Sequence, residues 1–99
     1  MPEKSLDDFP VFLERHLKLQ SAPDEPMTDV IIQVGYPVWV QQGLEASCPV
    51  AIRGVAGRTP HIRGVDQMDA MKNALIFIET YLTDRQGKPT FFWPNGEKY

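Results

Sequence analysis

One long apolar segment, from Asp66 to Thr83, constrains the fold of this chain more than any other feature. Asp66 can cap the first turn of a helix, and Asp69 places negative charge where the helix dipole favours it. Because this helix is strongly apolar on one side, we expect it to cover a sheet and to bury Leu75 and Ile78. Its apolar residues recur at spacings of three and four: Met68, Met71, Ala74, Leu75, Ile78, Tyr81 and Leu82.

A second helix is predicted near the N-terminus. Ser5 and Asp8 resemble a capping box, and Pro10 can be accommodated only in the first turn, so the helix would begin near Asp7 or Asp8. Seven residues then follow one another at helical spacing: Leu6, Phe9, Phe12, Leu13, His16, Leu17 and Leu19.

Strands are predicted between and after these helices. Residues 30–34 and 38–40 form a β-branched and aromatic run that is either one strand with a bulge or kink, or two short strands. Further strands are expected at 47–53, 60–63 and 90–93, with turns at 41–45 and 54–57. Pro49 lacks a backbone N–H, which indicates an edge position or a strand start.

These elements predict an α+β fold. An antiparallel sheet of three to five strands would pack against the long helix in the C-terminal half, with the N-terminal helix beside it or at an edge. The length of 99 residues fits a single domain spanning 1–99.

Composition narrows the class of protein. A net charge of -3 disfavours nucleic acid as a partner, because nucleic-acid affinity depends on Lys and Arg that neutralise phosphates. The single cysteine, Cys48, excludes an intrachain disulfide and favours a reducing cytoplasm. No segment has the run of about 20 apolar residues that a membrane span needs. We therefore expect a cytoplasmic protein without a membrane partner.

The sequence contains no recognisable catalytic, metal or phosphate motif. His16, Cys48 and His61 lack the paired spacing of a zinc site, and Cys48 lies in a strand pattern typical of a small buried hydrophobe. Paired carboxylates such as Asp66 and Asp69 have a simpler role at the start of a helix. We expect neither enzymatic activity nor a metal or other cofactor.

Basic residues gather around the turn at 54–57. Arg53, Arg58, His61 and Arg63 could hold an anion together with the amides of the turn, which would make the chain a small-ligand or anion-binding module. The simpler interpretation is a charged hairpin surface with salt bridges to acidic neighbours, and such surfaces are common.

Aromatic residues at strand ends are the remaining candidates for binding. Core packing accounts for most of them, but aromatic rings at a rim are also typical of partner surfaces. An open sheet edge at 90–93 could alternatively pair two copies in a structural homodimer. Five residues are the first candidates for contact with a protein partner: Asp24, Glu25, Tyr36, Trp39 and Trp93.

Residues 50–96 resemble a family of small uncharacterised bacterial α+β domains. The resemblance lies in Ile52-x-Gly54, Ile62-x-Gly64-Val65-Asp66, Ala70-Met71, Ala74-Leu75 and Phe92-Trp93-Pro94-Asn95-Gly96. It implies a single domain, with some members in settings where small proteins neutralise contact-delivered toxins, and it transfers no catalytic residues. We therefore expect a non-catalytic immunity-type protein that occludes a cognate toxin, since an acidic surface complements the basic cleft of a toxin acting on nucleic acid.

Overall fold

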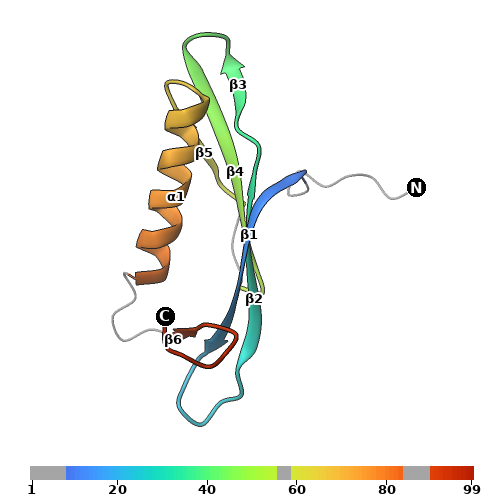
Figure 1. The fold of residues 1–99 in the computed structure, drawn as a ribbon, viewed down its shortest axis with the longest axis vertical. Helices are drawn as coiled ribbons and strands as arrows, with labels where there is room; N and C mark the ends of the chain where they lie inside the picture. Colours follow the sequence, from blue (N-terminus) through green and yellow to red (C-terminus); the bar gives the residue numbers. More distant parts are fainter. Residues whose placement is uncertain (1–8, 56–58, 84–89) are drawn as a thin grey trace, which may run out of the picture.

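The computed structural model describes residues 9–55, 59–83 and 90–99 of the chain. Figure 1 shows a curled sheet with one helix, α1, along one side of it. The elements in chain order are β1 (Val11–Gln20), β2 (Thr28–Gly35), β3 (Val38–Gln41), β4 (Glu45–Arg53), β5 (His61–Gly64), α1 (Gln67–Thr83) and β6 (Thr90–Phe92).

The sheet is antiparallel and six-stranded, and β4 is its centre. One end of β4 pairs with β2 and the other with β3, while β5 also pairs with β4. β1 lies beside β2, and β6 lies beside the last residues of β1. Of the two alternatives for 30–40, the structure therefore has two strands, β2 and β3, separated by Tyr36 and Pro37.

The predicted α+β fold with an N-terminal helix is wrong. Residues 11–20 form β1, and the described part of the chain is mostly strand with one helix. Leu17 and Leu19 are buried on the helix side of the sheet, whereas His16 and Lys18 lie on the other side. This alternation has a period of two, and it prevailed over the helical spacing because pairing with β2 buries one face of β1.

Pro49 does not lie at an edge or at a strand start, contrary to its predicted position. It lies within β4, is buried, and faces the break between β2 and β3. The amide of Val50 donates to Pro60 on the β5 side at 3.0 Å, so the nitrogen of Pro49 points towards the opposite side by strand alternation. No ladder hydrogen bond is lost, since β2 has ended at Gly35 and β3 begins at Val38.

α1 begins and ends where the sequence predicts, but its buried face is narrower. Asp66 Oδ1 accepts from the Asp69 amide at 2.8 Å, and Asp69 Oδ2 accepts from the Val65 amide at 2.9 Å. Ile78 is buried, whereas Leu75 is 42% exposed, so the predicted burial of Leu75 is wrong. The buried residues follow a four-residue spacing: Ala70, Ala74, Ile78 and Leu82.

The contacts of α1 determine where the sheet is left uncovered. The helix packs mainly on β4 and β5, and at Gly64 the backbones are so close that a Cβ would collide with the backbone of Asp69 and Ala70. The core under the helix contains Leu17, Val30, Ile32, Cys48 and Val50. The first half of β1 lies outside this layer, so a space remains between β1 and α1.

Candidate binding groove between α1 and β1

A β-bulge at the start of β1 directs an aromatic ring towards the helix. Val11 pairs with Gly35 and Leu13 pairs with Val34, so Phe12 is the extra residue of the bulge. The ring of Phe12 lies against the ring of Tyr36, with centroids 5.0 Å apart. Both rings border the space that α1 leaves open.

This space is a surface groove of about 670 Å³, which we call the apolar groove. Met68 is 84% exposed, and Phe12 and Tyr36 are each about half exposed. Gln67 Nε2 donates to the Pro37 carbonyl at 2.9 Å and fixes one end of the groove to the sheet. The lining residues are Phe12, Tyr36, Pro37, Gln67, Met68, Met71, Lys72 and Leu75.

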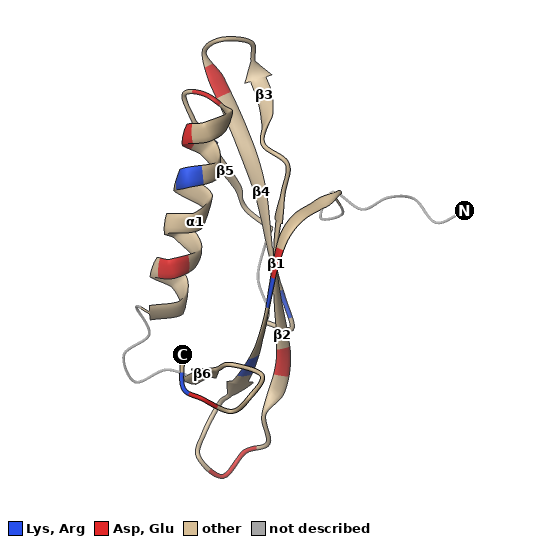
Figure 2. Ribbon diagram, viewed as in Figure 1, with Lys and Arg blue, Asp and Glu red and all other residues tan. Residues whose placement is uncertain are grey.

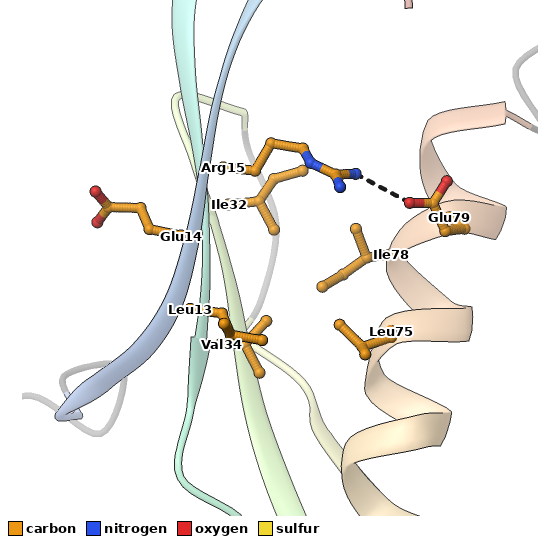
Figure 3. Close-up of a pocket in the computed structure, with 8 residues that line it drawn as sticks. All are labelled: Leu13, Glu14, Arg15, Ile32, Val34, Leu75, Ile78 and Glu79. Carbon is orange, nitrogen blue, oxygen red and sulfur yellow. Dashed lines mark hydrogen bonds and ion pairs between the residues drawn. The ribbon is translucent and has the colours of Figure 1, made fainter.

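A smaller cleft of about 180 Å³ adjoins the apolar groove at Leu75. We call it the inner cleft, and Figure 3 shows it between β1 and α1. Glu14 also borders the cleft, but its carboxylate lies on the far side of β1 and points away from the helix (Figure 3). The lining residues are Leu13, Glu14, Arg15, Ile32, Val34, Leu75, Ile78 and Glu79.

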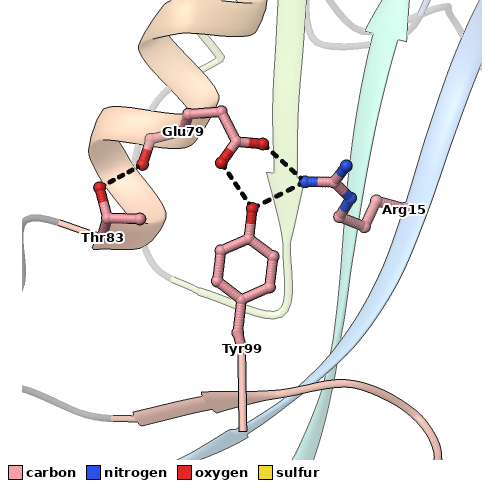
Figure 4. Close-up of polar contacts among 4 residues, drawn as sticks. All are labelled: Arg15, Glu79, Thr83 and Tyr99. Carbon is pink, nitrogen blue, oxygen red and sulfur yellow. Dashed lines mark hydrogen bonds and ion pairs between the residues drawn. The ribbon is translucent and has the colours of Figure 1, made fainter.

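A polar cluster lies at the inner cleft, because Arg15 and Glu79 belong to its lining. Figure 4 shows the contacts of this cluster. Arg15 Nη1 lies 2.9 Å from Glu79 Oε1 and donates to Tyr99 Oη at 2.9 Å, while Tyr99 Oη donates to Glu79 Oε2 at 2.7 Å. The Arg15 guanidinium also lies 5.3 Å from the ring centroid of Trp93. This cluster joins β1, α1 and the C-terminal segment.

The charges of this cluster are stabilised near neutral pH. Hydrogen bonds from Tyr99 and Arg15 lower the pKa of Glu79, and burial together with the Glu79 hydrogen bond raises the pKa of Tyr99. Glu79 therefore stays ionised and Tyr99 stays protonated. This protonation pattern suits a structural connection rather than proton transfer.

The structure distributes the five predicted partner contacts over different places. Tyr36 lies in the apolar groove, Trp93 lies over Arg15, and Trp39 packs against the core. Asp24 and Glu25 are exposed in the turn between β1 and β2, at the opposite end of β1 from the groove.

Sequence reasoning missed most of the groove. The sequence places Phe12 in a helix and places Met68 and Met71 on the apolar face of the helix at 66–83. The available signal was the width of the apolar face of α1, which is wider than the face that the sheet buries here. Met68 is therefore left in solvent, and Met71 borders the groove while still packing against the core.

The residues of the predicted anion site are spread out, and two have partners. Arg53 Nε donates to Gln33 Oε1 at 3.2 Å, and Arg63 lies 3.2 Å from Glu45. Arg63 pairs with Ser47 near one end of β4, whereas Arg53 lies at the other end. His61 is exposed on β5, and Arg58 lies outside the described residues. Figure 2 shows acidic and basic residues interspersed along the strands and the helix.

Cys48 is buried away from both histidines. Its thiol donates to the Gly35 carbonyl at 3.4 Å, and burial raises the pKa of the thiol. Cys48 pairs with Ile62, so the side chain of the neighbouring His61 lies on the opposite face of the sheet, as does that of His16. The described residues include no group of three or more His, Cys, Asp and Glu side chains able to hold a metal ion.

Among residues 9–55, 59–83 and 90–99, there is no helix long and apolar enough to cross a membrane. A search of curated proteins finds no significant match, and a search of solved structures finds none. A family model described as a domain of unknown function, DUF6968, matches residues 13–98, which include the segment 50–96 that carries the resemblance described above. The chain therefore belongs to the DUF6968 family.

Proposed function

We propose that this domain is a non-catalytic protein-binding module and that the apolar groove is its binding surface. The observation that carries the proposal is the contiguous exposure of Phe12, Tyr36, Met68 and Leu75. Contiguous exposed apolar surface typically marks an interaction site, and aromatic and Met side chains are enriched at interface cores.

The shape of the groove favours a protein over a small ligand. Small-molecule sites typically bury about 70–90% of their ligand in a concave pocket. Here the aromatic wall is about half exposed, and Met68 is almost entirely in solvent. A protein surface would exclude water from these side chains, whereas a small ligand would leave much of itself hydrated.

The proposed partner is a protein with a basic surface, and the proposed setting is the inhibition of a cognate toxin in the cytoplasm. Support comes from the net charge of -3. Beside the groove, Lys72 and Asp69 lie 3.5 Å apart and offset each other's charge. Opposite charge accelerates association and selects partners.

The test begins with capture from the source cell, identification of the partner, and measurement of affinity with both purified proteins. Leu75→Asp places a charge in the groove and should weaken binding by at least about 30-fold, as expected for a central interface residue. Ile76→Asp is the matched control, because Ile76 is exposed on the same helix but does not line the groove.

Both variants should melt within a few degrees of the parent, since neither residue is buried. A partner that binds the parent and Leu75→Asp with equal affinity would contradict the proposed surface. A partner that this protein binds but does not inhibit would be consistent with the proposed protein-binding function and would contradict the proposed immunity role.

A further inference from the structure

The geometry points to strand addition at β1: an extended segment of the protein partner pairs with the backbone of Glu14 and His16 and places alternate apolar side chains over the inner cleft. This inference rests on the proposed function and specifies how the partner binds. Two features meet at this edge of the sheet, an open backbone edge and an apolar cleft alongside it.

The outer edge of β1 is only partly occupied. β6 pairs with Lys18, Leu19 and Gln20, and the chain then turns at Pro94. Among the residues that the structure describes, none pairs with the outer edge of 11–17. A short extended segment can therefore pair with β1 beyond the turn at Pro94, which lies near His16 and Leu17.

The ladder identifies the free backbone groups. The Tyr99 amide donates to the Phe91 carbonyl at 3.0 Å, so the polar groups of Phe91 point away from β1. Lys18 and Phe92 are therefore the hydrogen-bonded pair of β1 and β6. Because backbone direction alternates along a strand, the N–H and C=O of His16 and Glu14 also point outward, and those of Arg15 and Leu17 point to β2.

The inner cleft offers exposed apolar side chains that the added strand would bury. Leu13 and Leu75 are each 42% exposed, and they face each other across the gap between β1 and α1 (Figure 3). A strand paired to β1 would lie about 4.8 Å from it, with every second side chain on the helix side. Those side chains would cover Leu13 and Leu75.

The start of this edge is apolar. Val11, Phe12 and Leu13 follow one another without a charge, and each is at least 40% exposed. The charged residues Glu14, Arg15 and Lys18 follow it, and charges on an edge select against strands that do not match them.

The charge beside this edge indicates the chemistry of the partner strand. The Glu14 carboxylate accepts from Gln33 at 2.9 Å and lies 2.7 Å from His16 on the outer face. A residue opposite Glu14 would lie within about 5 Å of it on the same face, which favours Lys or Arg there. Pairing two copies about Glu14 would instead oppose two carboxylates, so the partner strand fits better than a second copy.

The experiment uses the full 99-residue chain and peptides selected against it from a displayed random dodecapeptide library. The selected peptides should alternate apolar and polar residues, include Lys or Arg, and bind as extended strands. His16→Pro removes an outward N–H and should weaken binding at least tenfold, whereas His16→Ala should change affinity less than about twofold.

His16→Pro should keep its fold because the lost N–H makes no bond to β2, and a thermal melt checks this. If the variant unfolds, N-methylation of the peptide provides the same test on the unchanged protein. Methylating the amide that faces the His16 carbonyl should abolish binding, and methylating the next amide should not.

Three results would overturn strand addition. Helical peptides that are sensitive to Leu75→Asp and indifferent to His16→Pro would refute it while leaving the proposed function intact. Failure to select peptides, or selection of peptides insensitive to both substitutions, would refute both. Self-association that His16→Pro abolishes would identify a second copy as the occupant.

Discussion

Leu75 and Ile78 lie three residues apart in α1 and experience different surroundings. Ile78 is 5% exposed in the core, and Leu75 is 42% exposed between the apolar groove and the inner cleft. Ile78→Ala should therefore lower the free energy of unfolding by about 2–5 kcal/mol, the range of core truncations. Leu75→Ala should lower it by less than about 1.5 kcal/mol, because most of the side chain is not enclosed.

Urea denaturation of the two variants and the parent measures this difference. Equal losses from both substitutions would mean that Leu75 belongs to the core and that the groove contributes to stability rather than to binding. The sequence predicted burial of both residues because periodicity gives the angular position of a side chain. It does not give the breadth of the surface that covers the helix.

At the scale of elements, the Arg15–Glu79–Tyr99 cluster connects β1, α1 and the C-terminal segment (Figure 4). The pKa of Glu79 is lowered from its ordinary value of 4.5, first by the Tyr99 hydroxyl and then by Arg15. A lowered pKa in the folded state stabilises the fold above the unfolded pKa, and that stabilisation is lost as pH falls through the folded value. Stability should therefore decrease below about pH 4.5.

Tyr99→Phe removes the largest cause of this shift, so stability should depend less steeply on pH in the acid range. Unfolding followed from pH 7 down to pH 3 measures the slope, and Tyr36→Phe controls for loss of a tyrosine hydroxyl away from Glu79. Identical slopes in the parent and Tyr99→Phe would show that the cluster does not contribute to acid sensitivity. Solvent screens the half-exposed Arg15–Glu79 pair, so the slope of stability against pH should differ only slightly between the parent and Tyr99→Phe.

The elements differ in how far the sequence predicted them. The helix at 67–83 and the strands from β2 onward lie close to their predicted ranges, because strong periodicity and Gly or Pro boundaries coincide there. β1 was not predicted, although Leu17-Lys18-Leu19-Gln20 alternates strictly. Leu13 and Leu17 satisfy both a four-residue and a two-residue period, and only pairing with β2 distinguishes the two.

The groove was less predictable than the elements that form it. It depends on a bulge at Phe12 and on the break at Tyr36 and Pro37, which bring together residues from three elements. Neither the register of β1 nor the strands that α1 covers can be inferred from local sequence. A residue such as Met68 therefore has the same helical spacing whether it faces a core or solvent.

At the scale of the whole molecule, one helix covers only part of a six-stranded curled sheet. α1 packs mainly on β4 and β5, and β6 pairs with only the last residues of β1 (Figure 1). The uncovered apolar groove, the inner cleft and the open strand edge therefore occur together, along the first half of β1. This arrangement is the basis of the proposal that the domain binds a protein and of the proposed strand addition.

Amide hydrogen exchange of the isolated chain, measured by NMR at low protein concentration, tests this arrangement most directly. The amides of Glu14 and His16 should exchange at least roughly 100-fold faster than those of Arg15 and Leu17, which donate to β2 and open only with the sheet. A partner strand should then protect Glu14 and His16. Equal protection of all four amides in the isolated chain would show that the edge of β1 is already covered and would contradict strand addition at β1.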